Sequence, residues 1–241
     1  MYDEADQVEI VHRDALLTLP ATQALMQGLH GRGAVSFSGA LHFMARHRLA
    51  DVDQPARLRN FLQVLNQAEI VAYSKKYQTV RVTAPLPDGG EEFAPVVRVV
   101  EPDRPYSNVR HLREILRQCE SYIWWAEPHF SRKGLEPLVD EADAERITDI
   151  RILSGPAQVN DKATKDWKRF QAEMSALGIV SEWRVVQPPL PWHDRFIVSR
   201  RQTWNVPPIN TLYKGDYSEA SRTPTRPPFE AWWADGAPLP T

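Results

Sequence analysis

The residues with the clearest chemical potential lie in the second half of the chain, between positions 191 and 200. His193 and Arg195 are two positions apart, and an extended segment places such residues on one face. A cation neutralises the charge of a phosphate, and a neighbouring imidazole can attack phosphorus or donate a hydrogen bond. The apolar run Phe196-Ile197-Val198 that follows is typical of a buried strand. The pattern therefore predicts an oxyanion site held on a rigid strand.

This segment resembles the signature of the phospholipase D superfamily, which reads His-x-Lys, four residues, Asp, six residues, then Gly-Ser-x-Asn. His193 and Asn210 match in register, and Arg195 keeps the charge of the lysine. Arg200 stands where the signature has Asp, and Pro207-Pro208 where it has Gly-Ser. The run His-Asp-Arg-Phe also resembles the single-motif domains found C-terminal to microtubule-interacting-and-transport modules.

The resemblance implies an α/β domain in which His193, Arg195 and Asn210 form a phosphate site. In active members two such motifs face each other, one histidine acting as nucleophile and the other as general acid. This chain has one motif, so a second histidine would come from a homodimer or from His129. The lost Asp and Gly-Ser favour binding of a phosphate-bearing ligand, or a dimerisation role, without hydrolysis. The alternative is a metal-independent phosphodiesterase or nuclease with His193 as nucleophile, completed by dimerisation.

Three further residues are candidates to complete this site. Glu127 and His129 follow a predicted strand, and we expect them to open into the same cleft as His193. Lys214 can restore some of the positive charge that the altered motif lacks. The structural alternative for His193 is a buried, hydrogen-bonded side chain packed beside Trp192.

The elements around this motif alternate between helix and strand, which predicts an α/β arrangement on a central mixed sheet. The predicted helices span residues 107–119, 132–142 (kinked or restarted at Pro137) and 162–177. The predicted strands span residues 122–126, 147–153, 179–186, 195–199 and 209–213. The inner face of the third helix is expected to carry Trp167, Phe170, Met174 and Leu177. In the proline-rich tail, Phe229, Trp232 and Trp233 are expected to anchor the chain.

The first part of the chain reads as two helices followed by a hairpin. Ser36 is a capping residue for a helix with Phe37, Leu41 and Met44 on one face. A second helix is expected to open at Asp53, with Pro55 in its first turn. Its apolar residues follow the spacing of a buried stripe: Leu58, Phe61, Leu62 and Leu65. Strands at residues 69–73 and 77–83 complete the order of a winged helix.

This region is locally basic. Between His30 and Thr83 there are eight Lys or Arg and three Asp or Glu, while the whole chain has a net charge of −2. The second helix carries residue types that contact base edges and phosphates off its apolar stripe: Arg57, Arg59, Asn60, Gln63 and Asn66. Lys75 and Lys76 at the hairpin tip are placed to touch a phosphate backbone. The pattern predicts DNA binding, with a protein-contact surface as the open alternative.

Breaks in pattern at residues 84–90 and 101–105 divide the chain. We expect a winged-helix-like domain at residues 1–100 and a phospholipase D-like domain at residues 101–241, an α+β protein overall. The single cysteine, Cys119, excludes an internal disulfide and is expected in the core, and no Cys/His spacing indicates zinc. No metal or cofactor is expected. The acidic N-terminus lacks the pattern of a signal peptide and no run is apolar enough to span a membrane, so a cytoplasmic location is expected.

Overall fold

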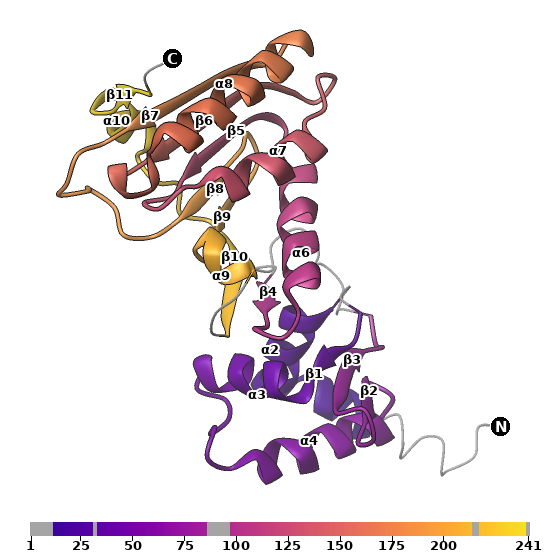
Figure 1. Cartoon of the computed structure of the whole chain (residues 1–241). Coiled ribbons are helices and arrows are strands. Elements are labelled where there is room, and N and C mark those ends of the chain that lie inside the picture. The colour runs from indigo at the N-terminus through magenta and orange to yellow at the C-terminus, as the bar shows by residue number, and fades with distance from the viewer. Residues whose placement is uncertain (1–11, 31–32, 86–96, 214–216, 240–241) are drawn as a thin grey trace. The chain divides into compact units, whose positions relative to one another are not determined.

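The computed structural model describes residues 12–30, 33–85, 97–213 and 217–239. The chain divides into two compact units, residues 1–99 and 100–241 (Figure 1). One sheet has three strands and the other is a larger mixed sheet, with helices beside both, so the expected α+β class is confirmed. No described helix is both long and apolar enough to cross a membrane.

From Pro20 onward, the first unit runs in the order helix, strand, helix, helix, strand, strand. Its elements are α2 (Pro20–Leu29), β1 (Val35–Ser36), α3 (Phe37–Arg46), α4 (Pro55–Gln67), β2 (Val71–Ser74) and β3 (Thr79–Val82). The strands pair antiparallel in the order β1-β3-β2, with Val71 opposite Val82 and Ser74 opposite Thr79. The sequence did not predict α2 or the two-residue strand β1. Helix α2 has no side-chain cap, and so lacks one of the signals that mark a helix start.

The two predicted helices of this unit are present, and one begins later than expected. The hydroxyl of Ser36 accepts a hydrogen bond from the Gly39 N–H at 2.9 Å, which confirms the predicted cap of α3. Helix α4 begins at Pro55 rather than at Asp53. A proline disfavours helical geometry in the residue before it, and Gln54 accordingly has φ −122° and ψ 56°.

The core of the first unit lies between the helices and the small sheet. Leu58, Leu62 and Leu65 of α4 are buried as predicted, whereas Phe61 is half-buried. The side chain of Asn66 accepts a hydrogen bond from the backbone N–H of Tyr73 at 2.8 Å, which ties the end of α4 to β2. The helix and the hairpin are therefore fixed to each other by packing and by a specific hydrogen bond.

The second unit is built on a mixed sheet with strand order β11-β7-β6-β5-β8-β9-β10, and β4 (Val97–Val100) spans the division between the two units. Its helices are α6 (Pro105–Arg117), α7 (Leu135–Glu141), α8 (Asp161–Ala176), α9 (Ile209–Tyr213) and α10 (Phe229–Ala234), with short 3-10 turns η1 (Arg132–Gly134) and η2 (Pro156–Gln158). Its strands are β5 (Ser121–Ala126), β6 (Ile147–Ser154), β7 (Val180–Val185), β8 (Phe196–Val198), β9 (Thr203–Asn205), β10 (Ser218–Thr223) and β11 (Ala237–Pro238). Strands β5, β6 and β7 are parallel to one another. Antiparallel pairing joins β8 to β5, β9 to β8, β10 to β9, and β11 to β7.

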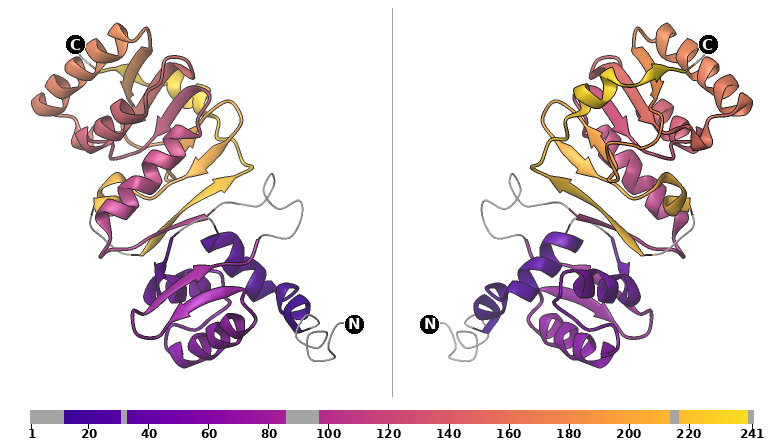
Figure 2. Two further views of the ribbon diagram at one scale, coloured as in Figure 1. Left: turned by 90° about the vertical axis from the view of Figure 1, so that its right-hand side faces the viewer. Right: turned by 90° about the vertical axis from the view of Figure 1, so that its left-hand side faces the viewer.

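The two faces of this sheet are covered by different helices (Figure 2). Because side chains alternate along a strand, neighbouring tryptophans of β5 point to opposite faces. Trp125 meets the ring of Phe130 edge-on, whereas Trp124 stacks on Phe229 of α10. On the α8 side, Trp167 packs edge-on against Trp183 of β7. The predicted anchors of the tail thus close one face, where Phe229 and Trp233 are buried and Trp232 stacks on Trp192.

Several predictions for the second unit are wrong in detail. Residues 209–213 form helix α9 rather than a strand. Pro207 and Pro208, just before them, have no backbone N–H to donate to a neighbouring strand, so a ladder cannot enter this segment from its amino side. Residues 132–134 form the 3-10 turn η1 and α7 begins at Leu135, so the predicted helix starts later than expected and Pro137 lies in its first turn. Leu177 is 47% exposed because α8 ends at Ala176. The sequence also did not predict strands β9 and β10. Cys119 is fully buried, as expected.

Candidate functional site

His193 is exposed and lies in the loop before β8 rather than on the strand. Both the on-strand placement and the alternative of a buried histidine are therefore wrong, although its neighbour Trp192 is buried, at 3% exposure. The backbone oxygen of His193 accepts a weak hydrogen bond from Arg195 at 3.4 Å. The imidazole of His193 is therefore open to solvent, and the guanidinium of Arg195 pairs with another residue.

That cation, Arg195, is paired with a buried carboxylate. Its Nε donates to the Oε1 atom of Glu127 at 3.2 Å, and Glu127 is fully buried. The same carboxylate accepts hydrogen bonds from the backbone N–H of His129 at 3.0 Å and from that of Ile209 at 3.4 Å. Glu127 therefore joins the end of β5, the start of β8 and the start of α9. The expectation that it opens into a cleft is wrong, whereas the side chain of His129 is exposed.

The electrostatics of this cluster follow from its burial. Removing the Glu127 carboxylate from water disfavours its charged form, and this effect raises its pKa above the ordinary value. The hydrogen bond from His129, the charge of Arg195 and the hydrogen bond from Ile209 act in the opposite direction. The three donors thus offset part of the cost of burying the carboxylate. The charge of Arg195 is used in this ion pair.

Asn210, the third residue of the motif, lies on α9 and contacts a different cation. The Nζ atom of Lys133 donates to its Oδ1 atom at 3.1 Å. The same ammonium lies 5.0 Å from the centre of the Tyr213 ring, a cation–π contact. The fold therefore gives Arg195 and Asn210 separate partners, and Lys214 lies outside the described residues.

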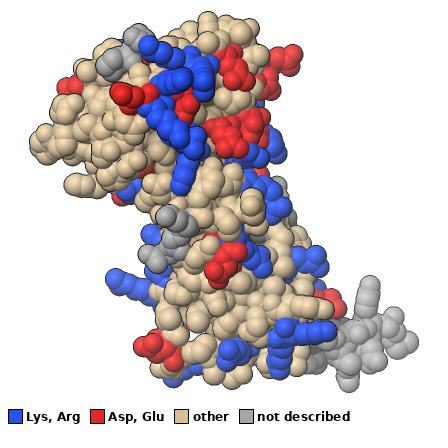
Figure 3. Space-filling view, viewed as in Figure 1, with Lys and Arg blue, Asp and Glu red and all other residues tan. Residues whose placement is uncertain are grey.

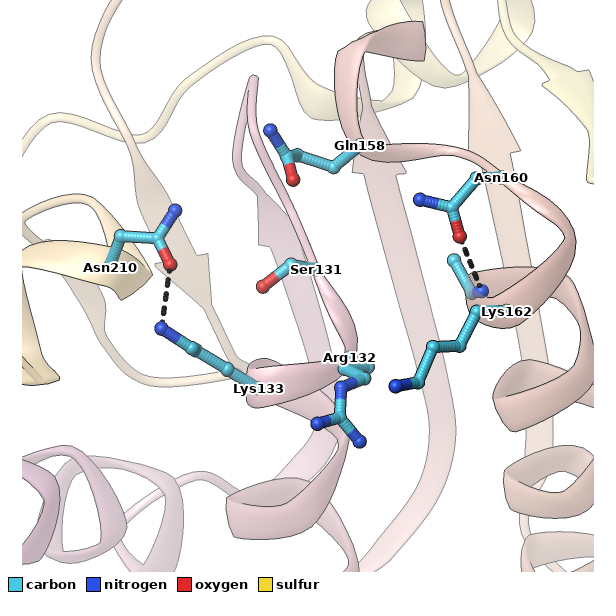
Figure 4. A pocket seen from close by; sticks show the side chains of 8 residues that line it. Ser131, Arg132, Lys133, Gln158, Asn160, Lys162 and Asn210 are labelled. Atoms are coloured by element: carbon cyan, nitrogen blue, oxygen red, sulfur yellow. Dashed lines mark hydrogen bonds between the residues drawn. The ribbon is translucent and has the colours of Figure 1, made fainter.

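Asn210 also lines a pocket of about 210 Å³ that the motif did not predict (Figure 4). The pocket is bounded by Ser131, Arg132, Lys133, Gln158, Asn160, Lys162, Ala163 and Asn210. Seven of these eight residues follow β5 or β6, so the pocket lies beyond the carboxyl ends of two neighbouring parallel strands, where α/β sheets commonly bind ligands. The signal in the sequence was the polar run Ser131-Arg132-Lys133 shortly after a predicted buried strand.

The first unit presents a second group of predicted site residues. Arg57, Arg59 and Asn60 are exposed on α4, and Gln63 is half-exposed on the same helix. Lys75 and Lys76 are exposed in the turn between β2 and β3, so these six predicted contacts reach the surface to some degree. The seventh predicted contact, Asn66, uses its side-chain oxygen to accept the hydrogen bond from the Tyr73 N–H. On the face shown in Figure 3, Lys and Arg side chains recur over this part of the unit.

Two of these cations have aromatic neighbours. The guanidinium of Arg59 lies 4.9 Å from the centre of the Phe37 ring, and the ammonium of Lys76 lies 5.2 Å from that of Tyr77. Among the residues that the structure describes, no carboxylate forms an ion pair with any of the four cations, Arg57, Arg59, Lys75 and Lys76. Their charges remain available to an external anion.

Within the described ranges, no group of three or more His, Cys, Asp or Glu side chains is arranged to hold a metal ion. No protein-family model matches the chain, and no curated protein is significantly similar to it. Among solved structures, the chain is similar to TrmBL2, described as an archaeal chromatin protein with a novel mode of DNA binding, with a TM-score of 0.40 and 10% sequence identity. That likeness covers 96% of this chain and 98% of the other, and at this level it establishes neither a shared fold nor a shared function.

Proposed function

We propose that this chain is a DNA-binding protein whose first unit contacts the duplex and whose second unit is a binding module without hydrolytic activity. The observation that carries the proposal is the set of cations on α4 and the β2–β3 turn with no described carboxylate partner. They belong to a unit with winged-helix element order, in which the helix before the hairpin commonly enters the major groove.

The geometry of α4 supports this assignment. Its buried side is filled by leucines, so its outer side carries Arg57, Arg59 and Asn60 on a rigid scaffold. Arg and Asn are the residue types that form paired hydrogen bonds with guanine and adenine in the major groove. Val64, 45% exposed on the same helix, offers an apolar contact of the kind that reads a thymine methyl group.

The hairpin supplies contacts of another kind. Lys75 and Lys76 lie at its tip beside Tyr77, which is 70% exposed. Lysines at a turn are point charges that neutralise phosphates irrespective of base sequence. We therefore assign sequence reading to α4 and backbone contact to the turn between β2 and β3.

The test is retention of the full chain on duplex DNA at several salt concentrations. Arg57→Glu combined with Arg59→Glu is expected to weaken binding by at least about tenfold, because each arginine–base contact contributes about 1–3 kcal/mol. The matched control is Arg200→Glu with Arg201→Glu, which makes the same charge change at exposed positions of the second unit. Equal losses in both variants, or binding that does not respond to salt, would remove the support for this interface.

For the second unit, binding without cleavage is supported by the contacts that its motif residues make within the protein. Arg195 is held by Glu127 and Asn210 by Lys133, so the groups that the phospholipase D signature uses to grip one phosphate have other partners. Incubation with bis(p-nitrophenyl) phosphate in EDTA is expected to give no hydrolysis above background. Metal-independent hydrolysis abolished by His193→Ala would instead establish the phosphodiesterase. Dimerisation stays a prediction, to be measured by light scattering.

A further inference from the structure

We propose that the pocket at the carboxyl ends of β5 and β6 binds a small molecule carrying a phosphate group, held by Arg132, Lys133 and Lys162. This inference concerns the second unit alone and is independent of DNA binding by the first. It also differs from the site suggested by the His193 motif, since Asn210 is the only motif residue that lines the pocket.

The charge of the lining is the first argument. Three of the eight lining residues are cations and none is acidic. Like charges gathered in one pocket repel each other, and an anion between them relieves that repulsion. In Figure 4, the Lys162 side chain extends from α8 toward Arg132 on η1. Two separate segments thus direct positive charge toward one space.

The partners of these cations leave most of that charge unneutralised. Lys133 donates to the neutral amide of Asn210. Arg132 lies 3.9 Å from Asp166, at the limit of an ion pair, and Asp166 is also shared with Arg169 at 3.7 Å. Among the described residues, no carboxylate pairs with Lys133 or Lys162. The pocket therefore keeps a net positive charge after its protein contacts are counted.

The backbone adds to this potential. Helix α8, 16 residues long, begins at the pocket, where the Asn160 side chain accepts a hydrogen bond from the Ala163 N–H at 3.0 Å. The amino end of a helix carries partial positive charge and favours anions. Beside it, the hydroxyl of Ser131 is buried and has no hydrogen-bond partner among the described groups, an unusual state for a buried polar atom.

The size of the pocket limits the ligand. Its volume of about 210 Å³ is below the range of about 300–1,000 Å³ typical of drug-sized ligands. That space suits a phosphate with a short organic group. The amide of Asn210, across from Lys162 in Figure 4, and that of Gln158, which extends from η2, are suited to contact hydroxyl groups of that ligand. A phosphomonoester of a small polyol therefore fits the charge, the size and the polar lining.

The experiment is isothermal titration of the full chain with four probes: inorganic phosphate, glycerol 3-phosphate, glycerol and a short DNA duplex. We expect glycerol 3-phosphate and phosphate to bind and glycerol not to bind. Arg132→Ala combined with Lys162→Ala is expected to weaken binding of glycerol 3-phosphate by at least about tenfold, since charge-assisted hydrogen bonds are the stronger class. Circular dichroism of each variant establishes that it is folded.

The matched control removes two positive charges elsewhere on α8. Lys165 and Lys168 are exposed on the same helix and do not line the pocket, so Lys165→Ala with Lys168→Ala is expected to leave binding unchanged. Arg57→Glu with Arg59→Glu is likewise expected to leave binding of glycerol 3-phosphate unchanged, which separates this proposal from the DNA interface.

Three results would overturn the proposal. One is the absence of glycerol 3-phosphate binding at millimolar concentration. Another is an equal loss of binding in the control that removes Lys165 and Lys168, which would indicate a general charge effect. The third is that the wild-type chain binds the DNA duplex but not glycerol 3-phosphate, and that the pocket variant no longer binds the duplex. That result would make the pocket a contact for the DNA backbone phosphate.

Discussion

The α4 surface of the first unit and the His193 segment of the second unit look alike in sequence and differ in the folded protein. Both carry arginines next to polar side chains, and both were predicted to hold phosphate. On α4, Arg57 and Arg59 are exposed and have no described carboxylate partner, whereas Arg195 is fixed to the buried carboxylate of Glu127. A cation therefore indicates an anion site only where the fold leaves its charge unneutralised.

The largest expected effect tests whether Glu127 holds the second unit together. Glu127→Ala leaves the guanidinium of Arg195 and two backbone N–H groups without their acceptor, so we expect a loss of about 3–5 kcal/mol in the free energy of unfolding. Urea unfolding followed by tryptophan fluorescence measures it. The control is Glu120→Ala, which breaks a surface pair with Arg201 and should cost less than about 1 kcal/mol. Similar costs for both variants would contradict the structural role of Glu127.

The next effect tests the free cations of the hairpin. Lys75→Ala with Lys76→Ala is expected to weaken binding to all duplexes by a similar factor, because backbone contacts carry no sequence information. It should also reduce the slope of log affinity against log salt by about 2, about one unit for each phosphate contact. A change in sequence preference with an unchanged slope would show that these lysines do not contact phosphates.

A third effect follows from the raised pKa of Glu127, caused chiefly by burial. Because the folded pKa exceeds the ordinary value of 4.5, the native state binds more protons than the unfolded state between these two pH values. The contribution of Glu127 to the free energy of unfolding therefore falls as pH rises from about 4.5 through the folded pKa. The measurement is urea unfolding of wild type and Glu127→Gln over this pH range. The difference between their free energies of unfolding should show this fall. A rise instead would mean that the charge of Arg195 outweighs burial.

The smallest effect concerns His193. Because its side chain is exposed and no side-chain hydrogen bond to a described residue is seen, His193→Ala is expected to change the free energy of unfolding by less than about 0.5 kcal/mol. Urea unfolding alongside Glu127→Ala measures the contrast directly. A cost above about 1 kcal/mol would place His193 among the structural residues of the segment and remove it from the candidates for ligand contact.

Local patterns in the sequence were sufficient for much of the secondary structure. The Ser36 cap, the leucine stripe of α4 and the apolar runs of β5 and β6 each depend on residues within about two helical turns. Such patterns indicate which face of a helix or strand is buried in the core. They failed at residues 209–213, where a short segment rich in β-branched residues follows two prolines and forms a helix.

By itself, the sequence determined the α+β class, the basic surface of α4 and the two lysines of the hairpin turn, because periodicity and residue type are local properties. Only the tertiary structure decided what became of the motif at His193. The partner of Arg195 is 68 residues away in the chain, and Lys133 is 77 residues from Asn210. The neutralisation of a charge depends on which groups the fold brings within a few ångströms of it, so the same residue types give an exposed cation on α4 and a cation paired with the buried carboxylate of Glu127 in the second unit.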